Sequence, residues 1–209
     1  TQIKGDGETH PLLSPDDEFA DYETWDLGNL DASEAKTDDM LAAEYAREAL
    51  KRGLLIEDRL GTNPYKFGMI GSTDSHTSLA TTQEDNFFGK HSGVEPEPHR
   101  WEHVVIESPV DPSLTTLGWQ QASSGYAAVW ATENTREAIF DAIVRKEVYA
   151  TTGSRMWVRF FGGWDFMEED ALNRLPAEIG YSKGVPMGGD LLEAPEGKTA
   201  PTFLVAALK

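Results

Sequence analysis

A long amphipathic segment followed directly by a short apolar run is the feature that most limits how this chain can fold. Residues 38–60 predict a helix, because apolar residues recur on one face. These residues are Leu41, Tyr45, Leu50 and Leu54. Gly61 is a helix stop, and residues 67–71, FGMIG, predict a buried strand. A helix followed by a buried strand is the repeating unit of an α/β sheet or barrel, so we expect an α/β fold.

The remainder of the chain predicts alternating elements around one long loop. Residues 77–124 are loop-like apart from a strand at 103–106, and a loop of this length is typically functional or mobile. Beyond it we expect helices at 134–146 and 166–175, and strands at 147–151, 156–161 and 201–208.

The charge of the chain excludes some classes of partner. Acidic residues number 36 and basic residues 18, a net charge of −18, so general nucleic-acid binding and binding to anionic membranes are not expected. No run of 18 apolar residues predicts a membrane span. Cysteine is absent, so a metal would have to use His, Asp, Glu or backbone oxygen. A cysteine-free chain fits the cytoplasm and the periplasm equally.

Asp74 and His76, in the segment FGMIGSTDSHT, are the strongest candidates for a metal-binding element in the sequence. In extended chain, residues i and i+2 point to the same side, so both would project from the carboxyl end of the 67–71 strand. Carboxylate and imidazole together suit Zn, Mn or Fe. A simpler interpretation is an aspartate that caps the following turn and a histidine that is exposed in a loop.

Other residues are weaker candidates for the site. Glu8 and His10 form a second acid-x-His pair, which would contribute a metal ligand, act as catalytic acid or base, or contact substrate, unless they only belong to a turn closed by Pro11. Arg155, with Thr152 nearby, is a candidate for binding an anionic substrate. The remaining histidines have no metal-ligand spacing and predict surface positions: His91, His99 and His103.

Several long stretches resemble the bacterial family called domain of unknown function 3604, which is related to the polymerase-and-histidinol-phosphatase (PHP) superfamily. These stretches are QIKGDGETHPLLSPDDEFADYE, NPYKFGMIGSTDSHT, AAVWATENTREAIFDAIVRKEVYATTGSRMWVRFFGGW, and GVPMGGDL with APTFLVAAL. They cover well over half of the chain. The resemblance implies a distorted (β/α)7 barrel that holds two or three divalent metal ions (Zn, Mn or Fe) at the carboxyl ends of its strands.

The resemblance also implies roles for residues. Asp74 and His76 correspond to the late Asp-x-His motif of the superfamily and would be metal ligands, and Glu8 and His10 would lie near the site. The superfamily opens with a His-x-His motif that these residues lack. We therefore expect the C-terminal part of a PHP-like barrel at 1–153, with the missing N-terminal half as its partner. Residues 154–209 would begin a β-sandwich-like domain that is cut short.

Two functions follow as expectations. The first is a metal-dependent hydrolase of phosphate or related esters, acting on a small anionic substrate, with the 209 residues alone expected to be inactive. The alternative is a non-catalytic module whose β domain binds carbohydrate or a protein partner. A nuclease of the same superfamily is disfavoured by the net charge of −18. Family members often carry export signals, which favours a periplasmic or secreted protein without excluding the cytoplasm.

Overall fold

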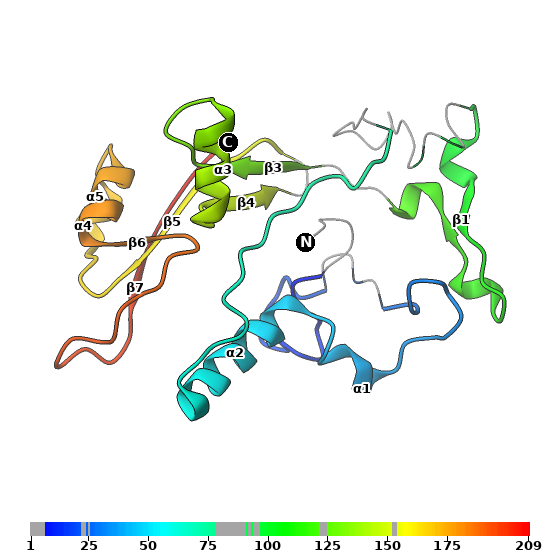
Figure 1. Ribbon diagram of the computed structural model, residues 1–209, viewed down its shortest axis with the longest axis horizontal. Coiled ribbons are helices and arrows are strands. Elements are labelled where there is room, and N and C mark those ends of the chain that lie inside the picture. The colour runs from blue at the N-terminus through cyan, green and yellow to red at the C-terminus, as the bar shows by residue number, and fades with distance from the viewer. Residues whose placement is uncertain are drawn as a thin grey trace. The chain divides into compact units, whose positions relative to one another are not determined.

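The computed structural model describes residues 7–21, 24, 26–77, 91, 93, 97–121, 125–151 and 154–209. The chain divides into two compact units (Figure 1). The first comprises Thr1–Phe67 and Gly71–Tyr126, and the second comprises Gly68–Ile70 and Ala127–Lys209. The predicted division at residue 153 stays a prediction.

The helix predicted at 38–60 is present as two helices, α1 (Asp38–Leu41) and α2 (Ala46–Leu60). The break occurs because Tyr45 is extended (φ −103°, ψ 139°) and buried. The backbone N–H groups of Ala46 and Arg47 donate to the carbonyls of Gly7 and Glu8, at 3.1 and 2.9 Å. The first backbone N–H groups of a helix have no acceptor within the helix. Here the two carbonyls accept from them, so α2 begins without a side-chain cap.

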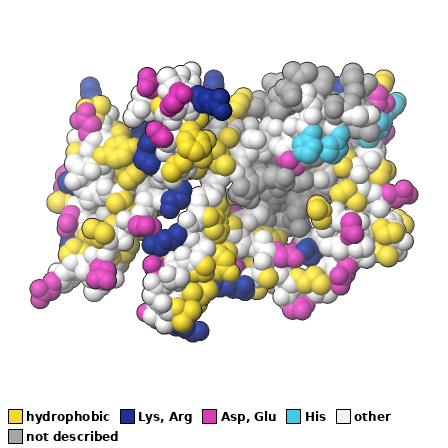
Figure 2. Space-filling view, viewed as in Figure 1, with side chains coloured by type: hydrophobic (Ala, Val, Ile, Leu, Met, Phe, Trp, Pro, Cys, Tyr) yellow, Lys and Arg dark blue, Asp and Glu magenta, His cyan; other side chains and the backbone are white. Residues whose placement is uncertain are grey.

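The end of α2 follows the prediction. Gly61 is left-handed (φ 69°), and its N–H donates to the carbonyl of Glu57 at 2.8 Å. In the C-terminal half of this helix, Leu54, Leu55 and Leu60 are exposed, and hydrophobic side chains are visible along the helix in Figure 2. The predicted apolar face is therefore only partly buried: Leu41 and Tyr45 are buried, whereas Leu54 is exposed.

The strand predicted at 67–71 is wrong, because these residues have no regular secondary structure. Phe67 is exposed, and Met69 and Ile70 are half-buried. A short apolar run forms a strand only when a neighbouring strand pairs with it, and no described strand does so here.

Two short strands complete the first unit. β1 (Val104–Ile106) pairs antiparallel with β2 (Thr116–Leu117), with an irregular register between Val104 and Ile106. Short 3-10 turns accompany them at Arg100–Glu102, Pro112–Leu114 and Gly118–Gln121. The strand predicted at 103–106 is thereby confirmed.

The second unit begins with a β–α–β segment. β3 (Tyr126–Val129) and β4 (Val148–Thr151) form a two-stranded sheet, and α3 (Arg136–Val144) connects them. The helix cap is Thr135, whose hydroxyl accepts from the N–H of Ala138 at 3.3 Å. The helix at 134–146 and the strand at 147–151 are both confirmed to within two residues.

A three-stranded antiparallel sheet forms the remainder of the unit, in the order β6–β5–β7 (Figure 1). Its strands are β5 (Trp157–Gly163), β6 (Gly184–Pro186) and β7 (Thr202–Leu208). Phe161, Phe166 and Leu204 form the core, with Ala177 and Ile179 packed against it. The strands predicted at 156–161 and 201–208 are confirmed.

The helix predicted at 166–175 is largely wrong. The structure has α4 (Glu168–Ala171) and a separate helix, α5 (Pro176–Lys183). Pro176 lies in the first turn of α5, where its missing N–H costs nothing, so proline starts this helix. Gly180 allows α5 to lie close to Phe161, since a Cβ there would be 2.3 Å from the phenyl ring.

The predicted mixed α/β content is confirmed. The described strands form small sheets, and they do not close into a barrel. None of the helices in the described ranges combines the length and apolar character that crossing a membrane requires.

Candidate functional site

Asp74 and His76 lie in contact, but not for the reason that the sequence predicted. Asp74 has a left-handed backbone (φ 55°), which no strand residue adopts, so the chain turns at this position. Its Oδ1 lies 3.3 Å from His76 Nε2. The side chain of Asp74 is 13% exposed and that of His76 is 54% exposed, so the pair lies at the surface with the carboxylate on the inner side.

The distance between Asp74 Oδ1 and His76 Nε2 fits two ligands of one metal ion. A charge-assisted hydrogen bond from nitrogen to oxygen is typically shorter, about 2.7–2.9 Å. Two donors bound tetrahedrally at about 2.0–2.1 Å from a zinc ion lie about 3.3–3.4 Å apart. The donor types and their separation therefore match part of a tetrahedral site, although 3.3 Å also allows a weak hydrogen bond.

His91 is the residue near this pair that the sequence prediction missed. Its ring packs edge-on against the ring of His76, with the centroids 4.7 Å apart and the planes at 81°. The two residues form an isolated parallel backbone bridge. Histidine side chains are visible at the surface in Figure 2. Because His91 lies well beyond His76 in the chain, no local spacing signals a contact that tertiary structure sets.

As the side chains stand, no three His, Asp or Glu residues in the described ranges converge as a metal site. Asp74 and His76 thus supply the correct donor types for two ligands. Small polar residues surround them: Ser75 Oγ and Thr77 Oγ1 are 2.8 Å apart, and the Ser75 N–H donates to Thr73 Oγ1 at 3.3 Å.

Glu8 is bound by Arg47 of α2. The guanidinium contacts both carboxylate oxygens of Glu8, through Nε to Oε1 and through Nη2 to Oε2 at 2.7 Å. Its Nη1 donates to Asp17 at 2.8 Å and to Ser14 at 3.3 Å. These contacts raise the pKa of Arg47, and the hydrogen bond from Arg47 lowers the pKa of Asp17.

His10 is buried, 6% exposed, and both of its ring nitrogens are engaged. The N–H of Leu12 donates to Nδ1 at 3.2 Å, so the ring proton of a neutral His10 lies on Nε2. Nε2 then donates to Asp26 Oδ2, also at 3.2 Å. The ring packs against Tyr45 with a centroid distance of 5.6 Å. Glu8 and His10 are therefore neighbours in sequence with separate partners in the structure.

The profile of the family described as "Protein of unknown function (DUF3604)" matches residues 1–209. The chain belongs to this family. Comparison with curated proteins and with solved structures gave no match.

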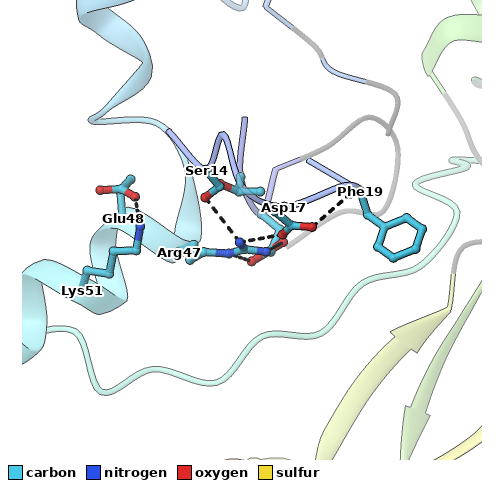
Figure 3. Close-up of polar contacts among 8 residues, drawn as sticks. Ser14, Asp17, Phe19, Arg47, Glu48 and Lys51 are labelled. Carbon is cyan, nitrogen blue, oxygen red and sulfur yellow. Dashed lines mark hydrogen bonds and ion pairs between the residues drawn. The ribbon is translucent and has the colours of Figure 1, made fainter. Parts of the chain in front are cut away.

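A hollow of about 630 Å³ lies beside Arg47 in the DUF3604 chain. It is lined by Leu13, Ser14, Pro15, Asp16, Asp17, Glu18, Phe19, Arg47 and Lys51. Both cations at the hollow have carboxylate partners, since Arg47 binds Glu8 and Asp17 while Lys51 binds Glu48 at 2.6 Å (Figure 3). Such a lining carries no excess positive charge, so it does not suit an anionic substrate.

The predicted substrate-binding residue Arg155 belongs to the second unit of the DUF3604 chain. Arg155 is exposed, and Thr152 lies outside the described residues. The polar network of this unit is centred on Arg159, whose guanidinium stacks 3.4 Å from the ring centroid of Trp130. Arg159 also donates to the Tyr181 hydroxyl at 3.1 Å.

Tyr181 joins this network to a buried carboxylate in the DUF3604 chain. Its hydroxyl donates to Glu147 Oε1 at 2.5 Å, and Arg145 donates twice to Oε2 of Glu147, at 3.0 and 3.1 Å. Burial and the hydrogen bond to Glu147 raise the pKa of Tyr181. Because these polar groups satisfy one another, we interpret the network as structural support for β4, β5 and α5.

Proposed function

We propose that this DUF3604 chain contributes to a metal-dependent hydrolase of phosphate or related esters, and that Asp74 and His76 are metal ligands. The observation that carries the proposal is the 3.3 Å separation of Asp74 Oδ1 and His76 Nε2. Family membership supports it through the resemblance of the family to PHP-like barrels. In this proposal the chain forms the C-terminal part of such a barrel, followed by a β-rich domain.

A divalent metal, when bound, would polarise the substrate and lower the pKa of a water molecule toward neutrality. The residues of this chain would supply the donors and their orientation. Asp74, turned inward at 13% exposure, would bind through Oδ1, and His76 through Nε2. Ser72 and Ser75 are small, and their size leaves room for substrate beside the pair.

Two predicted roles remain part of this proposal. His10, whose ring orientation is set by Leu12 and Asp26, would hold or move a proton on Nε2. Glu8 would act through Arg47, which already binds both of its oxygens, and so would position the N-terminal segment against α2.

Metal quantification on the intact gene product, purified without chelator, tests the proposal. Asp74→Asn keeps a residue type that tolerates the left-handed backbone but removes the charged donor. We expect the zinc affinity of this variant and of His76→Ala to be lower than that of the wild type by about 10–100-fold or more. His99→Ala is the matched control, because His99 is exposed and contacts Glu102. A wild-type protein that binds no transition metal would contradict the proposal.

Hydrolysis is tested separately with a panel of phosphate mono- and diesters. Activity should require added metal and be lost in Asp74→Asn and His76→Ala but not in His99→Ala. Metal binding without activity on any ester would retain the ligand assignment and overturn the hydrolase.

A second candidate, a carbohydrate-binding module, is favoured by one observation. Trp157 at the start of β5 is 60% exposed, and its ring lies edge-on to Trp130 at 6.4 Å. An exposed indole provides a flat apolar surface with a polar N–H, which suits a sugar ring. Phe161 is buried and Trp164 is half-buried, so Trp157 would have to carry the binding. Glycan-array binding that disappears in Trp157→Ala but persists in Trp119→Ala would support this candidate; Trp119 is similarly exposed.

A further inference from the structure

The second half of α2 has one side that the chain itself covers. The chain turns back after Gly61, and Asn63 lies against Gly53, where a Cβ would be 2.3 Å from Asn63 Oδ1. The Asn63 amide also donates to Glu57 Oε2 at 3.3 Å, and Lys66 Nζ lies 3.4 Å from Glu57 Oε1. Gly53 and Glu57 are four residues apart and share one face of the helix, so the returning segment covers this face.

The opposite side of the helix is exposed. Leu55 lies nearly opposite Gly53, because two residues of an α-helix turn through about 200°. Arg52 and Arg59 lie on the same side as Leu55, three residues before it and four residues after it. Leu54 adjoins them, and the exposed fractions of Leu54 and Leu55 are 65% and 56%. Arg52, Leu54, Leu55 and Arg59 are called the outer face of α2 below.

The charge of this region differs from that of the chain as a whole. Residues 46–67 carry five basic and three acidic side chains, whereas the chain carries 18 basic and 36 acidic ones. Three of the five basic side chains form ion pairs with carboxylates. Within the part of the chain that the structure describes, no ion pair joins Arg52 or Arg59 to a carboxylate. One acidic residue, Asp58, adjoins Leu54, so the outer face keeps an excess of positive charge.

We propose that the outer face of α2 binds an acidic amphipathic helix of a partner protein. A single exposed leucine needs no explanation, but two adjoining leucines between unpaired arginines form a mixed apolar and cationic surface. A partner helix with apolar side chains on one face and carboxylates beside them would cover the leucines and pair with the guanidinium groups. The contact does not depend on the proposed metal ligands.

The same charges disfavour two other occupants. A second copy of the chain bound symmetrically through this face would bring arginines against arginines. An anionic membrane would attract the arginines and leucines, but the net charge of −18 repels the chain from such a surface. The 15-residue helix is about 22 Å long, so the contact would be smaller than the roughly 800 Å² per partner of stable complexes. We therefore expect weak, transient binding.

A designed peptide helix provides the probe for the intact protein. One face of the peptide carries leucines flanked by glutamates, and fluorescence anisotropy of an attached dye reports its binding. We expect this acidic peptide to bind although the protein is itself negatively charged, and added salt should weaken the binding. No binding of the peptide at concentrations up to about 1 mM would overturn the proposal.

Variants locate the binding on the helix. Leu55→Ala and the double variant Arg52→Glu with Arg59→Glu should each weaken binding of the acidic peptide by about 10-fold or more. Leu172→Ala and Arg174→Glu make the same changes at exposed positions outside α2 and should bind like wild type. Circular dichroism checks that each variant is folded. Equal binding by wild type and the α2 variants would place the peptide elsewhere and contradict the proposal.

Further measurements separate the possible occupants. On the wild type, the acidic peptide should shift the methyl resonances of Leu54 and Leu55 but not those of Leu172. Binding to vesicles of equal parts phosphatidylserine and phosphatidylcholine that is lost in Leu55→Ala would assign the face to a membrane and overturn the protein partner. A concentration-dependent increase in sedimenting mass that is lost in the same variant would instead assign it to a second copy.

Discussion

Arg47 ties the N-terminal segment to α2 through a single side chain. Its guanidinium contacts Glu8, Asp17 and Ser14, while its own backbone N–H donates to the carbonyl of Glu8. The partners lie far from Arg47 in sequence, so these contacts close a long loop of the chain. The side chain and the backbone of Arg47 therefore both hold the N-terminal segment against the start of α2.

Replacing Arg47 with alanine should destabilise the protein by about 1–2 kcal/mol, because two carboxylates lose a partner that is one-third exposed. The midpoint of urea unfolding measures this change. Arg52→Ala, at an exposed position of the same helix, should remain within about 0.5 kcal/mol of wild type. The pKa of Asp17 should rise in Arg47→Ala, as followed by NMR titration; equal effects of the two variants would contradict the assignment.

The candidate site was predictable only in part at this scale. The spacing of Asp74 and His76 placed them together, but by assuming an extended strand, whereas a left-handed turn at Asp74 brings about the contact. His91 could not be found from spacing, because its position beside His76 depends on how distant segments pack. Short-range patterns identify residues that are close in sequence, and tertiary structure decides which distant residues lie beside them.

At the scale of elements, α5 lies closely against β5 because Gly180 has no side chain. A Cβ at this position would lie 2.3–2.5 Å from three atoms of the Phe161 ring, which is buried in the core of the second unit. A phenyl ring in a packed core cannot move aside without displacing Phe166 and Leu204.

Gly180→Ala should therefore destabilise the protein. Overpacking costs about 1–3 kcal/mol, and the better helix propensity of alanine offsets at most about 1 kcal/mol of it. Calorimetry should show a lower melting temperature for this variant. Glu178→Ala, at an exposed position of the same helix, should leave it nearly unchanged. An increase in melting temperature for Gly180→Ala would contradict the close packing of α5.

The start of α4 predicts a dependence of stability on pH. Lys183 donates to both oxygens of Asp170 at 2.7 and 2.8 Å, and the Met167 N–H donates to Oδ2 at 2.8 Å. These bonds lower the pKa of Asp170 below its ordinary value of 3.8. The stabilisation is therefore complete above pH 3.8 and is lost as pH falls through the lowered pKa.

Below about pH 4 the wild type should lose stability more steeply than Asp170→Asn, because the asparagine cannot be protonated. The pH dependence of the urea midpoint measures this difference. Lys183→Gln removes the main cause of the lowered pKa and should also reduce the steepness. If the slopes of both variants match that of wild type, Asp170 does not contribute.

The elements themselves were predicted best where local sequence determines them. Capped helix α3 and the apolar strands β5 and β7 carry their own signals, and they lie within two residues of the prediction. The strand predicted at 67–71 is wrong because a strand requires a neighbouring strand to pair with, and residues 67–71 do not by themselves specify one. The start of α5 at Pro176 carries its own local signal, because proline is favoured in the first turn of a helix.

At the scale of the whole molecule, charge governs how copies of the chain meet. The net charge of −18 makes them repel one another near neutral pH, and the sequence pI is about 4.5. Acidification toward that pH removes the repulsion while leaving apolar surface in place. Salt weakens the same repulsion by screening it.

Strand β7 is the element that we expect to mediate contact between copies once the repulsion is lost. In the described part of the chain β7 pairs only with β5, so one side of its backbone offers unpaired N–H and C=O groups. Its sequence, TFLVAAL, has no charge and no proline, and Phe203, Val205 and Leu208 are exposed. This combination is typical of strands that recruit further strands.

Near pH 4.5 the protein should therefore self-associate through β7, and light scattering should rise steeply there. Val205→Lys places a charge on the exposed face of the strand and should suppress the scattering. Leu192→Lys adds the same charge at an exposed position outside the sheet and should not. An edge strand thus makes acidic conditions an aggregation hazard for a chain whose copies repel one another at neutral pH.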